Sequence, residues 1–300
     1  MQIFKVRVKP VEDRLDRFLA SQTKNLSRSK IQKLIVEGKI LVNKKGVGQN
    51  YKIHSGDTIT LNLPPPKDTE IKAEDMPVKV LYEDSDLLVI EKESGVVVHP
   101  TSDHTSGTIV NWLLFHTKNL AVAEEGIRPG VVHRLDKGTS GLLILGKNSQ
   151  TTQELKKQFA ARQVTKKYTA LVIGEMAKPF GSIKTNIGRH PRSFQKFAVL
   201  EAGKEAETDY RVVKQFQGFT LVSVFPKTGR THQIRVHLSS IGFPIVGDKL
   251  YGAPADLGRL FLHASEIEFS HPRTGKILKF FSELPDALQA YLDGLSLKKD

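Results

Sequence analysis

Residues 133–141 read HRLDKGTSG and precede an apolar run at 142–145. The segment holds one carboxylate, Asp136, between cations, and nearby guanidinium or ammonium groups favour the ionised form of a carboxylate. A charged carboxylate beside groups that can bind phosphates is a candidate nucleophile or general base. A second interpretation also fits, in which Asp136 and Thr139 only build a turn between two strands.

A second polar segment, residues 227–238, reads KTGRTHQIRVHL. Three apolar residues in and after it have helical spacing: Ile234, Leu238 and Ile241. This pattern predicts a helix that begins near Thr231, which would cap it, and ends at Gly242.

On such a helix His232 and Arg235 share one face. We expect Arg235 to pair with Asp136 and to hold it ionised and correctly aimed; the alternative is a surface arginine in an exposed ion pair, which contributes little. His232 and His237 are five residues apart, unlike the i, i+4 pair of a helical metal site, and the chain has no cysteine. We therefore predict no metal site and no cofactor.

A third segment places two cations, Lys166 and Lys167, directly before Tyr168 at the start of a predicted strand. An aromatic ring can stack on an extruded base while lysines hold its phosphates. The alternative is that Tyr168 packs in the core as an ordinary strand residue with its hydroxyl bonded.

The composition limits the class of protein. The 300 residues carry a formal charge of +13, and this excess of cations predicts a polyanionic partner, most simply a nucleic acid. A basic protein of a ribosome or membrane surface would have a similar composition. No apolar stretch approaches the roughly 18 residues of a membrane span, and the start MQIFK alternates apolar and polar residues, unlike a signal peptide. With no cysteine, the chain is expected to be cytoplasmic.

The chain is predicted to divide at a linker, residues 64–75, that begins PPPKD. The small domain before it, residues 1–63, is strongly basic and shows two short helices followed by strands. Its helices are predicted around Leu15 to Leu19 and Ile31 to Ile35, the second after a Ser27 cap. Cations near the second helix and the following turn could meet phosphates, or could form a solvated face: Arg28, Lys30, Lys33, Lys44 and Lys45.

Residues 76–300 show strand patterns with scattered helices, and no internal repeat. Residues 208–216 and 220–225 flank Gln217-Gly218, which predicts a hairpin and an antiparallel pair. Helices are predicted at 110–115, at 151–162 and from about Thr231. The predicted fold class is α+β, a mixed and largely antiparallel sheet with flanking helices, together with the small N-terminal α/β module.

The first 63 residues resemble the RNA-binding module named after small-subunit ribosomal protein four. The resemblance rests on the segments RLDRFL (14–19), SRSKIQKLI (27–35) and GKILVN (38–43). It implies that the pair of helices docks on folded RNA, in agreement with the charge.

The remainder resembles the RluA/RluD family of pseudouridine synthases. The resemblance rests on three segments in the same order and spacing, HRLD with TSG (133–141), KY (167–168) and GRTHQIR (229–235), and it extends over residues 76–285. One departure is visible: Glu93 stands where the family usually has proline. That segment supports the site, so the departure bears on loop rigidity more than on activity.

The resemblance implies that Asp136 is the catalytic aspartate, Tyr168 the base-stacking tyrosine and Arg235 the ionic partner of the aspartate. Arg134 would help to hold the flipped nucleotide. Further substrate-binding residues are expected in the same segments: His133, Thr139, Arg230 and His232.

The activity so implied is the isomerisation of specific uridines in RNA, most simply in large-subunit ribosomal RNA, with transfer RNA as the alternative substrate. The reaction consumes no cofactor, and Asp136 would either attack C1′ or abstract the C2′ proton. An RNA-binding or ribosome-assembly protein with an idle large domain is the rival reading. A glycosidase is less favoured, because most use two carboxylates. We expect a monomer with an RNA partner and no membrane partner.

Overall fold

The structure is a computed structural model that describes residues 2–6, 13–23, 26, 28–62, 71–101, 103–117, 129–193, 195–252 and 257–297. The chain forms two compact units, Met1–Glu70 and Ile71–Asp300. The predicted cap Ser27 and residues 64–70 of the predicted linker lie outside the described residues. No helix in the described part of the chain has the length and apolar character needed to cross a membrane.

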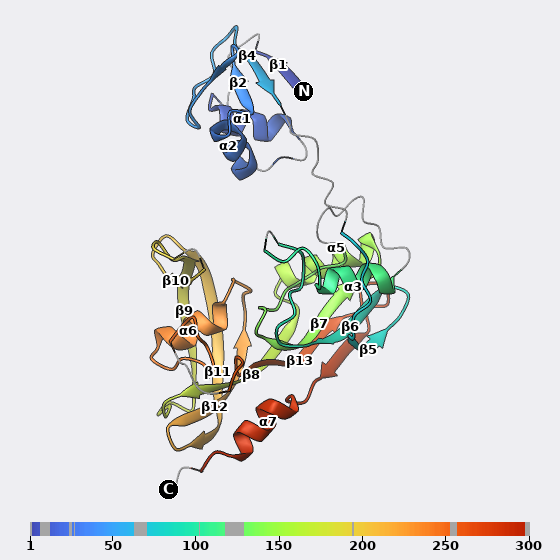
Figure 1. Ribbon diagram of the computed structural model, residues 1–300, viewed down its shortest axis with the longest axis vertical. Helices are drawn as coiled ribbons and strands as arrows, with labels where there is room; N and C mark the ends of the chain where they lie inside the picture. The colour runs from blue at the N-terminus through green and yellow to red at the C-terminus, as the bar shows by residue number, and fades with distance from the viewer. Residues whose placement is uncertain are drawn as a thin grey trace. The chain divides into compact units, whose positions relative to one another are not determined.

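The first unit is two helices on a small antiparallel sheet, with strand order β1-β4-β2-β3 (Figure 1). Its elements are β1 (Gln2–Lys5), α1 (Leu15–Gln22), α2 (Arg28–Val36), β2 (Ile40–Val42), β3 (Lys45–Gly46) and β4 (Thr58–Leu61). The apolar residues that gave the helical pattern are buried, among them Leu15, Leu19 and Ile31. Asn43 and Lys44 have positive φ at the β2–β3 turn, so this turn leaves their side chains exposed.

The second unit is a large sheet with helices on its faces. Its strands are β5 (Lys79–Glu83), β6 (Leu87–Lys92), β7 (Ser140–Gly146), β8 (Thr165–Ile173), β9 (Phe180–Arg189), β10 (Phe197–Val199), β11 (Lys204–Phe216), β12 (Phe219–Pro226), β13 (Leu262–Ser270) and β14 (Ile277–Phe281). Its helices are α3 (Ile109–His116), α5 (Ser149–Ala160), α6 (Gln233–Ser240) and α7 (Asp286–Asp293).

Among the described residues the sheet has the order β10-β9-β11-β12-β8-β13-β7-β6-β5, and β14 pairs with β13. The β13–β7 pair is parallel and the other pairs are antiparallel. The predicted fold class, a mixed and largely antiparallel sheet with flanking helices, is confirmed. The hairpin predicted at Gln217-Gly218 joins β11 to β12, and Gly218 has a φ of 75° that suits glycine.

The β6–β7 part of the sheet is covered on both faces, which explains why its strands are apolar without alternation. Leu88, Ile90 and Leu143 belong to the core that includes α3. The intervening residues Leu87 and Leu142 pack with α5 on the other face. The strand pair is therefore a rigid, dry support for the residues that precede β7.

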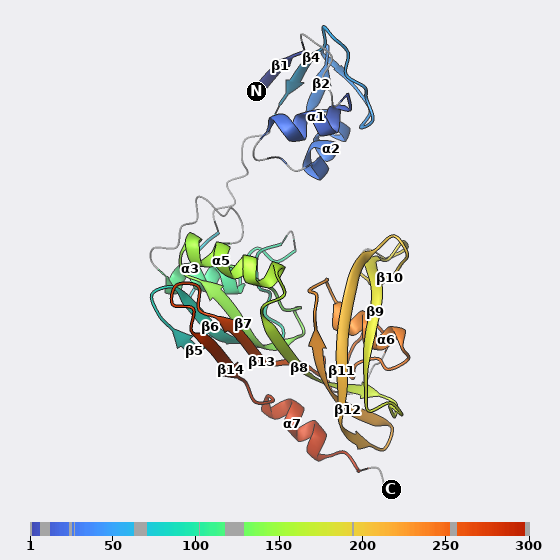
Figure 2. The same cartoon turned by 180° about the vertical axis from the view of Figure 1, so that it is seen from behind.

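Helix α6 lies against the part of the sheet formed by β9, β10 and β11, as both ribbon views show (Figures 1 and 2). It begins at Gln233, and its N-cap residue is His232 in the left-handed conformation, with no side-chain cap. The prediction of Thr231 as the cap is therefore wrong. The backbone turns sharply at His232, and that turn sends its ring and Arg235 toward the same cavity.

Candidate active site

Asp136 lies in the loop that leads into β7. The amide of Thr139 donates to the carbonyl of Asp136 at 3.1 Å, which closes the turn considered in the sequence, and the amide of Gly95 donates to the carbonyl of Lys137 at 2.7 Å. The Asp136 side chain is 16% exposed. Its carboxylate is therefore held on an ordered loop and can be reached from solvent.

Lys92, at the end of β6, contacts the backbone of this loop. The sequence did not lead us to predict a role for it. Its ammonium is fully buried and donates to the carbonyls of Glu93 and Val96, each at 2.8 Å, and more weakly to that of Lys137 at 3.4 Å. Burial lowers the pKa of Lys92 to about 7. The segment that contains the unusual Glu93 is thus tied to the Asp136 loop through Lys92. The two-residue period of a strand could have indicated this burial, since residue 92 lies on the same face of β6 as the buried Leu88 and Ile90.

Arg235 approaches Asp136 from α6, with 3.5 Å between Nη1 and Oδ2. Its shorter contacts are with Asp248: Nε donates to Oδ2 at 2.7 Å and Nη2 donates to Oδ1 at 2.8 Å. Burial alone lowers the pKa of Arg235, but the hydrogen bonds to Asp248 and the charges of both carboxylates raise it above its usual value. Arg235 therefore stays charged between two carboxylates, of which the sequence predicted only Asp136.

Tyr168 enters the site from β8 and is 9% exposed. Burial, aided by the negative charge of Asp136, raises the pKa of Tyr168 well above its ordinary value. Its phenol is therefore neutral, and its ring forms part of an apolar wall.

These residues surround one pocket of about 420 Å³. Its walls come from the Asp136 loop, α5, β8, the segment after β12 and α6. Lining residues include Arg134, Asp136, Thr139, Lys166, Tyr168, Arg230, His232 and Arg235. Three segments that are far apart in the sequence thus meet at one cavity.

The other predicted site residues have different surroundings. His133 lines the pocket, but its Nε2 accepts from the amide of Ile144 at 2.9 Å and its ring stacks on Phe159. Burial, together with the nearby charge of Lys166, lowers the pKa of His133 to about 3, so the ring is neutral. Its contacts make it a wall of the pocket. Thr139 is also buried there.

The predicted cations lie at several depths. Arg134 and Arg230 are exposed pocket residues, and Nε of Arg230 donates to the carbonyl of Glu205 at 2.9 Å. Lys166 is half-buried, and burial lowers its pKa to about 8. Lys167 is half-buried and is not among the lining residues.

In the first unit, the predicted RNA contacts Lys30, Lys33, Lys44 and Lys45 are exposed, as is Arg28. Arg28 also has a structural role: its Nε donates to the buried carboxylate of Asp16 at 2.8 Å, beside Arg14 and Gln32. Burial alone would raise the pKa of Asp16, but these hydrogen bonds hold it well below its usual range.

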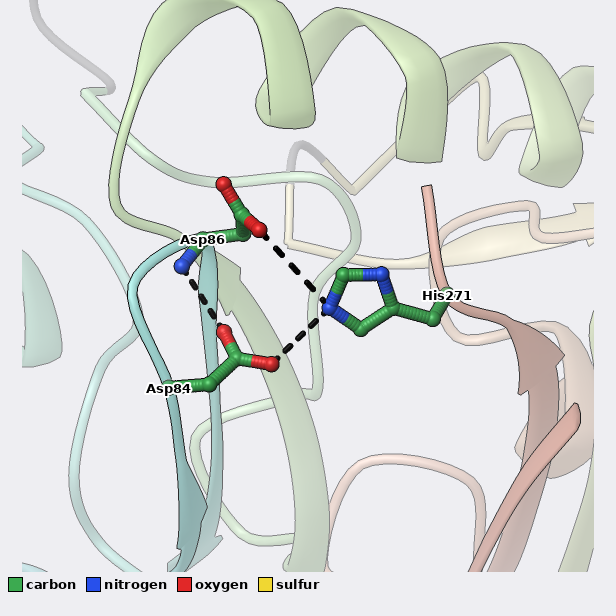
Figure 3. A group of neighbouring side chains, drawn as sticks. All are labelled: Asp84, Asp86 and His271. Atoms are coloured by element: carbon green, nitrogen blue, oxygen red, sulfur yellow. Dashed lines mark hydrogen bonds and ion pairs between the residues drawn. The ribbon is translucent and has the colours of Figure 1, made fainter. Parts of the chain in front are cut away.

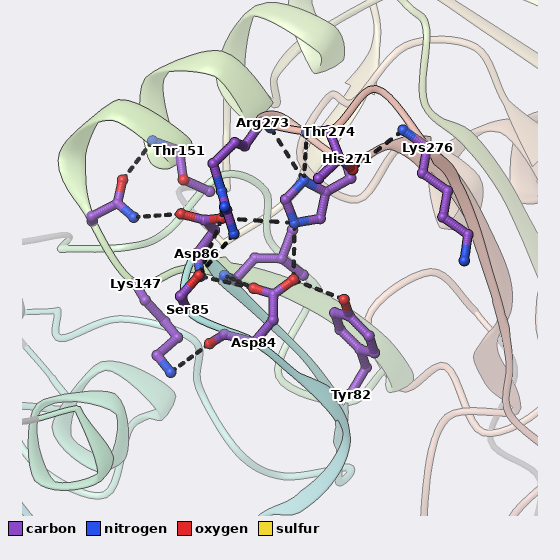
Figure 4. Close-up of polar contacts among 12 residues, drawn as sticks. Tyr82, Asp84, Ser85, Asp86, Lys147, Thr151, His271, Arg273, Thr274 and Lys276 are labelled. Carbon is purple, nitrogen blue, oxygen red and sulfur yellow. Dashed lines mark hydrogen bonds and ion pairs between the residues drawn. The ribbon is translucent and has the colours of Figure 1, made fainter.

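One group of described residues outside the pocket has possible metal-ligating atoms close together: Asp84, Asp86 and His271 (Figure 3). These atoms already have hydrogen-bond or ion-pair partners in the protein. Nε2 of His271 contacts Oδ2 of Asp84 at 2.8 Å, the Tyr82 hydroxyl donates to the same oxygen at 2.7 Å, and Nε of Arg273 donates to Asp86 at 2.6 Å (Figure 4). The group therefore forms a hydrogen-bond network that joins the β5–β6 turn to the β13–β14 turn.

Comparison with known proteins identifies the class. The family model for RNA pseudouridylate synthase matches residues 86–240, and the S4 domain model matches residues 13–59. The RNA pseudouridine synthase YlyB of Bacillus subtilis is 42% identical over 285 residues, which cover 94% of either chain. The human RNA Pseudouridylate Synthase Domain Containing 1 has a TM-score of 0.58 at 26% identity, covering 79% of this chain and 94% of that one.

The chain therefore belongs to the RNA pseudouridylate synthase family and is an RNA pseudouridine synthase. It is of the RluA/RluD type with an N-terminal S4 domain, as the sequence motifs predicted. A relative of this type, ribosomal large subunit pseudouridine synthase D of Nitrosomonas europaea, is 39% identical over 293 residues, covering 94% of this chain and 84% of that one.

Proposed function

We propose that this enzyme isomerises uridines of large-subunit ribosomal RNA, with Asp136 as the catalytic residue. The observation that carries the proposal is the convergence of Asp136, Tyr168 and Arg235, from a loop, a strand and a helix, on one pocket. The substrate is inferred from relatives whose names specify the large ribosomal subunit. The domains divide this work: residues 1–63 bind RNA, 64–75 link, and 76–300 carry out the reaction.

In this mechanism the target uridine leaves its stack and enters the pocket. Extrusion costs a few kcal/mol, and stacking on the ring of Tyr168 offsets about 1–3 kcal/mol of it. In one route Asp136 attacks C1′ and displaces N1 of the uracil; after the uracil turns, C5 attacks C1′ and releases the Asp136 carboxylate. In the other route Asp136 removes the C2′ proton as the N1–C1′ bond breaks, which leaves a glycal, and returns that proton when C5 bonds to C1′. In both routes the C5 proton then leaves and N1 takes up a proton, while Arg235 keeps the side chain of Asp136 aimed.

The cations at the pocket mouth and on the S4 domain bind the phosphates in this proposal. Arg134, Arg230 and Lys166 line the pocket, which supports a role in binding the target nucleotide. Lys30, Lys33, Lys44 and Lys45 are exposed on the first unit for flanking RNA, which makes affinity strongly dependent on salt. The enzyme is cytoplasmic and monomeric in this proposal. Sedimentation with and without RNA tests the oligomeric state.

The decisive variant is Asp136→Asn, which keeps the volume of the side chain but cannot act as nucleophile or base. Release of tritium from C5-labelled uridine RNA falls at least about 10⁴-fold, as expected when a catalytic group is lost, while the dissociation constant for RNA changes by less than a factor of about three. Tritium release at the wild-type rate by Asp136→Asn contradicts the assignment. Pseudouridine mapping by carbodiimide stops, in RNA from cells with and without the gene, identifies the substrate; changes only in transfer RNA overturn the ribosomal assignment.

A further inference from the structure

Arg235 makes a different kind of contact on each side of its guanidinium. One edge, formed by Nε and Nη2, is taken by the two oxygens of Asp248. One face lies over the ring of Tyr251, with Cζ 4.9 Å from the ring centre. Nη1 is the nitrogen that forms the ion pair with Asp136. A bidentate edge contact and a stacked face together fix both the position and the plane of an arginine.

Asp248 is itself fixed by the backbone around it. Its side chain is fully buried, and Oδ1 accepts from the amides of Leu250 and Tyr251 at 3.0 and 3.1 Å. Gly247, just before it, has a φ of 76°, and a Cβ there would lie 1.9 Å from the carbonyl oxygen of Arg259. The turn is therefore closely packed at Gly247, and two backbone hydrogen bonds hold the carboxylate of Asp248 in place.

Tyr251 is held by its hydroxyl. The amide of Phe197 donates to its oxygen at 2.8 Å, and Nδ1 of His232 lies 2.9 Å from the same oxygen. The ring of His232 also meets the ring of Tyr251 edge to face. The left-handed turn at His232 thus places its ring against Tyr251, and the ring of Tyr251 in turn packs on one face of Arg235.

We infer that Asp248 and Tyr251 are positioning residues for the isomerisation, acting through Arg235. They hold the arginine so that Nη1 faces Asp136 as an ion-pair partner. Asp248 also offsets the charge of Arg235, so that Asp136 contacts a cation that is already paired and is not tied into a bidentate ion pair of its own. The inference rests on the proposed catalytic role of Asp136.

The primary test is Asp248→Asn, with the exposed Asp293→Asn on α7 as the matched control. The amide still accepts from the turn but opposes the N–H groups of Arg235. We expect kcat for tritium release to fall about 100-fold, the scale of a displaced reacting group, with KM within about threefold of wild type. Asp293→Asn leaves both kcat and KM unchanged.

A double-mutant cycle separates positioning from general structural damage. In an Arg235→Lys background, Asp248→Asn is expected to cost less than about threefold in kcat, because the bidentate guanidinium contact is already absent. Tyr251→Phe keeps the ring under Arg235 and costs only a few fold, whereas Tyr251→Leu costs at least about tenfold. Equal losses from Asp248→Asn in both backgrounds, or a loss of thermal stability with an unchanged kcat, overturn the inference.

The outcomes also separate this inference from the proposed function. If Asp136→Asn still releases tritium, the catalytic assignment fails whatever Asp248→Asn does. If Asp136→Asn is inactive and Asp248→Asn matches wild type, only the positioning role is overturned.

Discussion

The buried ammonium of Lys92 makes stability depend on pH in a way that one substitution can remove. Its pKa is about 7 in the folded protein because of burial, against an ordinary value of 10.5. Each pKa unit of that difference corresponds to about 1.36 kcal/mol. The buried Lys92 therefore lowers the free energy of unfolding by about 5 kcal/mol at neutral pH. The ammonium donates to three carbonyls, which satisfies it inside the protein.

The sign follows from proton binding. Between pH 7 and 10.5 the unfolded chain holds a proton on Lys92 more often than the folded protein does, so the free energy of unfolding rises with pH across this window. Below pH 7 both states are protonated and the contribution is constant. Lys92→Met removes the group. The free energy of unfolding of wild type minus that of the variant should therefore increase by about 3 kcal/mol between pH 7 and 9.5.

Urea unfolding at pH 7, 8.2 and 9.5 measures this difference. Trp112, the single tryptophan of the chain, is buried in α3 and reports on the unit that contains Lys92. The control is Lys156→Met on α5, where the side chain is exposed and no such trend is expected. A difference between wild type and Lys92→Met that stays the same at all three pH values refutes the reasoning.

Further predictions concern stacking, packing and phosphate contacts. Tyr168→Leu removes base stacking worth about 1–3 kcal/mol, so kcat/KM in the tritium assay falls about 5- to 150-fold without a loss of folding by circular dichroism. Gly247→Ala places a Cβ against a backbone carbonyl and lowers the thermal midpoint by at least about 6 °C, whereas Gly252→Ala, with positive φ but open space, lowers it less. Neutralising Lys44 and Lys45 together reduces the slope of log affinity against log salt by about two; an unchanged slope in filter binding rejects their phosphate contacts.

Local patterns predicted the elements that carry the site. The spacing of apolar residues predicted helices at 110–115 and 151–162, which the structure extends to 109–116 and places at 149–160. The apolar run at residues 142–145 forms the middle of β7 (Ser140–Gly146). These elements are decided by periodicity and by short turns such as Gln217-Gly218, which are local properties.

What the sequence could not provide depends on distant contacts. Asp248 follows a glycine in a loop, and nothing in its neighbours indicates that Arg235, 13 residues earlier, will use both of its oxygens. The cap at α6 was misjudged because Thr231 is the better capping residue by type, whereas the observed turn is set by the packing of His232 on Tyr251. The pairing of β10 with β9 at the edge of the sheet likewise depends on tertiary contacts and could not be predicted from the local sequence.

The charge distribution of the pocket separates the phosphates of a substrate from its base. At the mouth, Arg134 and Arg230 are exposed cations suited to phosphates.

Deeper in the pocket the aromatic groups are neutral: burial lowers the pKa of His133 to about 3 and raises that of Tyr168. Arg235 lies between Asp248 and Asp136, and the ammonium groups of Lys166 and Lys92 are also close to this part of the pocket. In the proposed reaction, positive charge develops at the sugar as the N1–C1′ bond breaks. A carboxylate in a weakly solvated pocket stabilises that charge more strongly than it would in water.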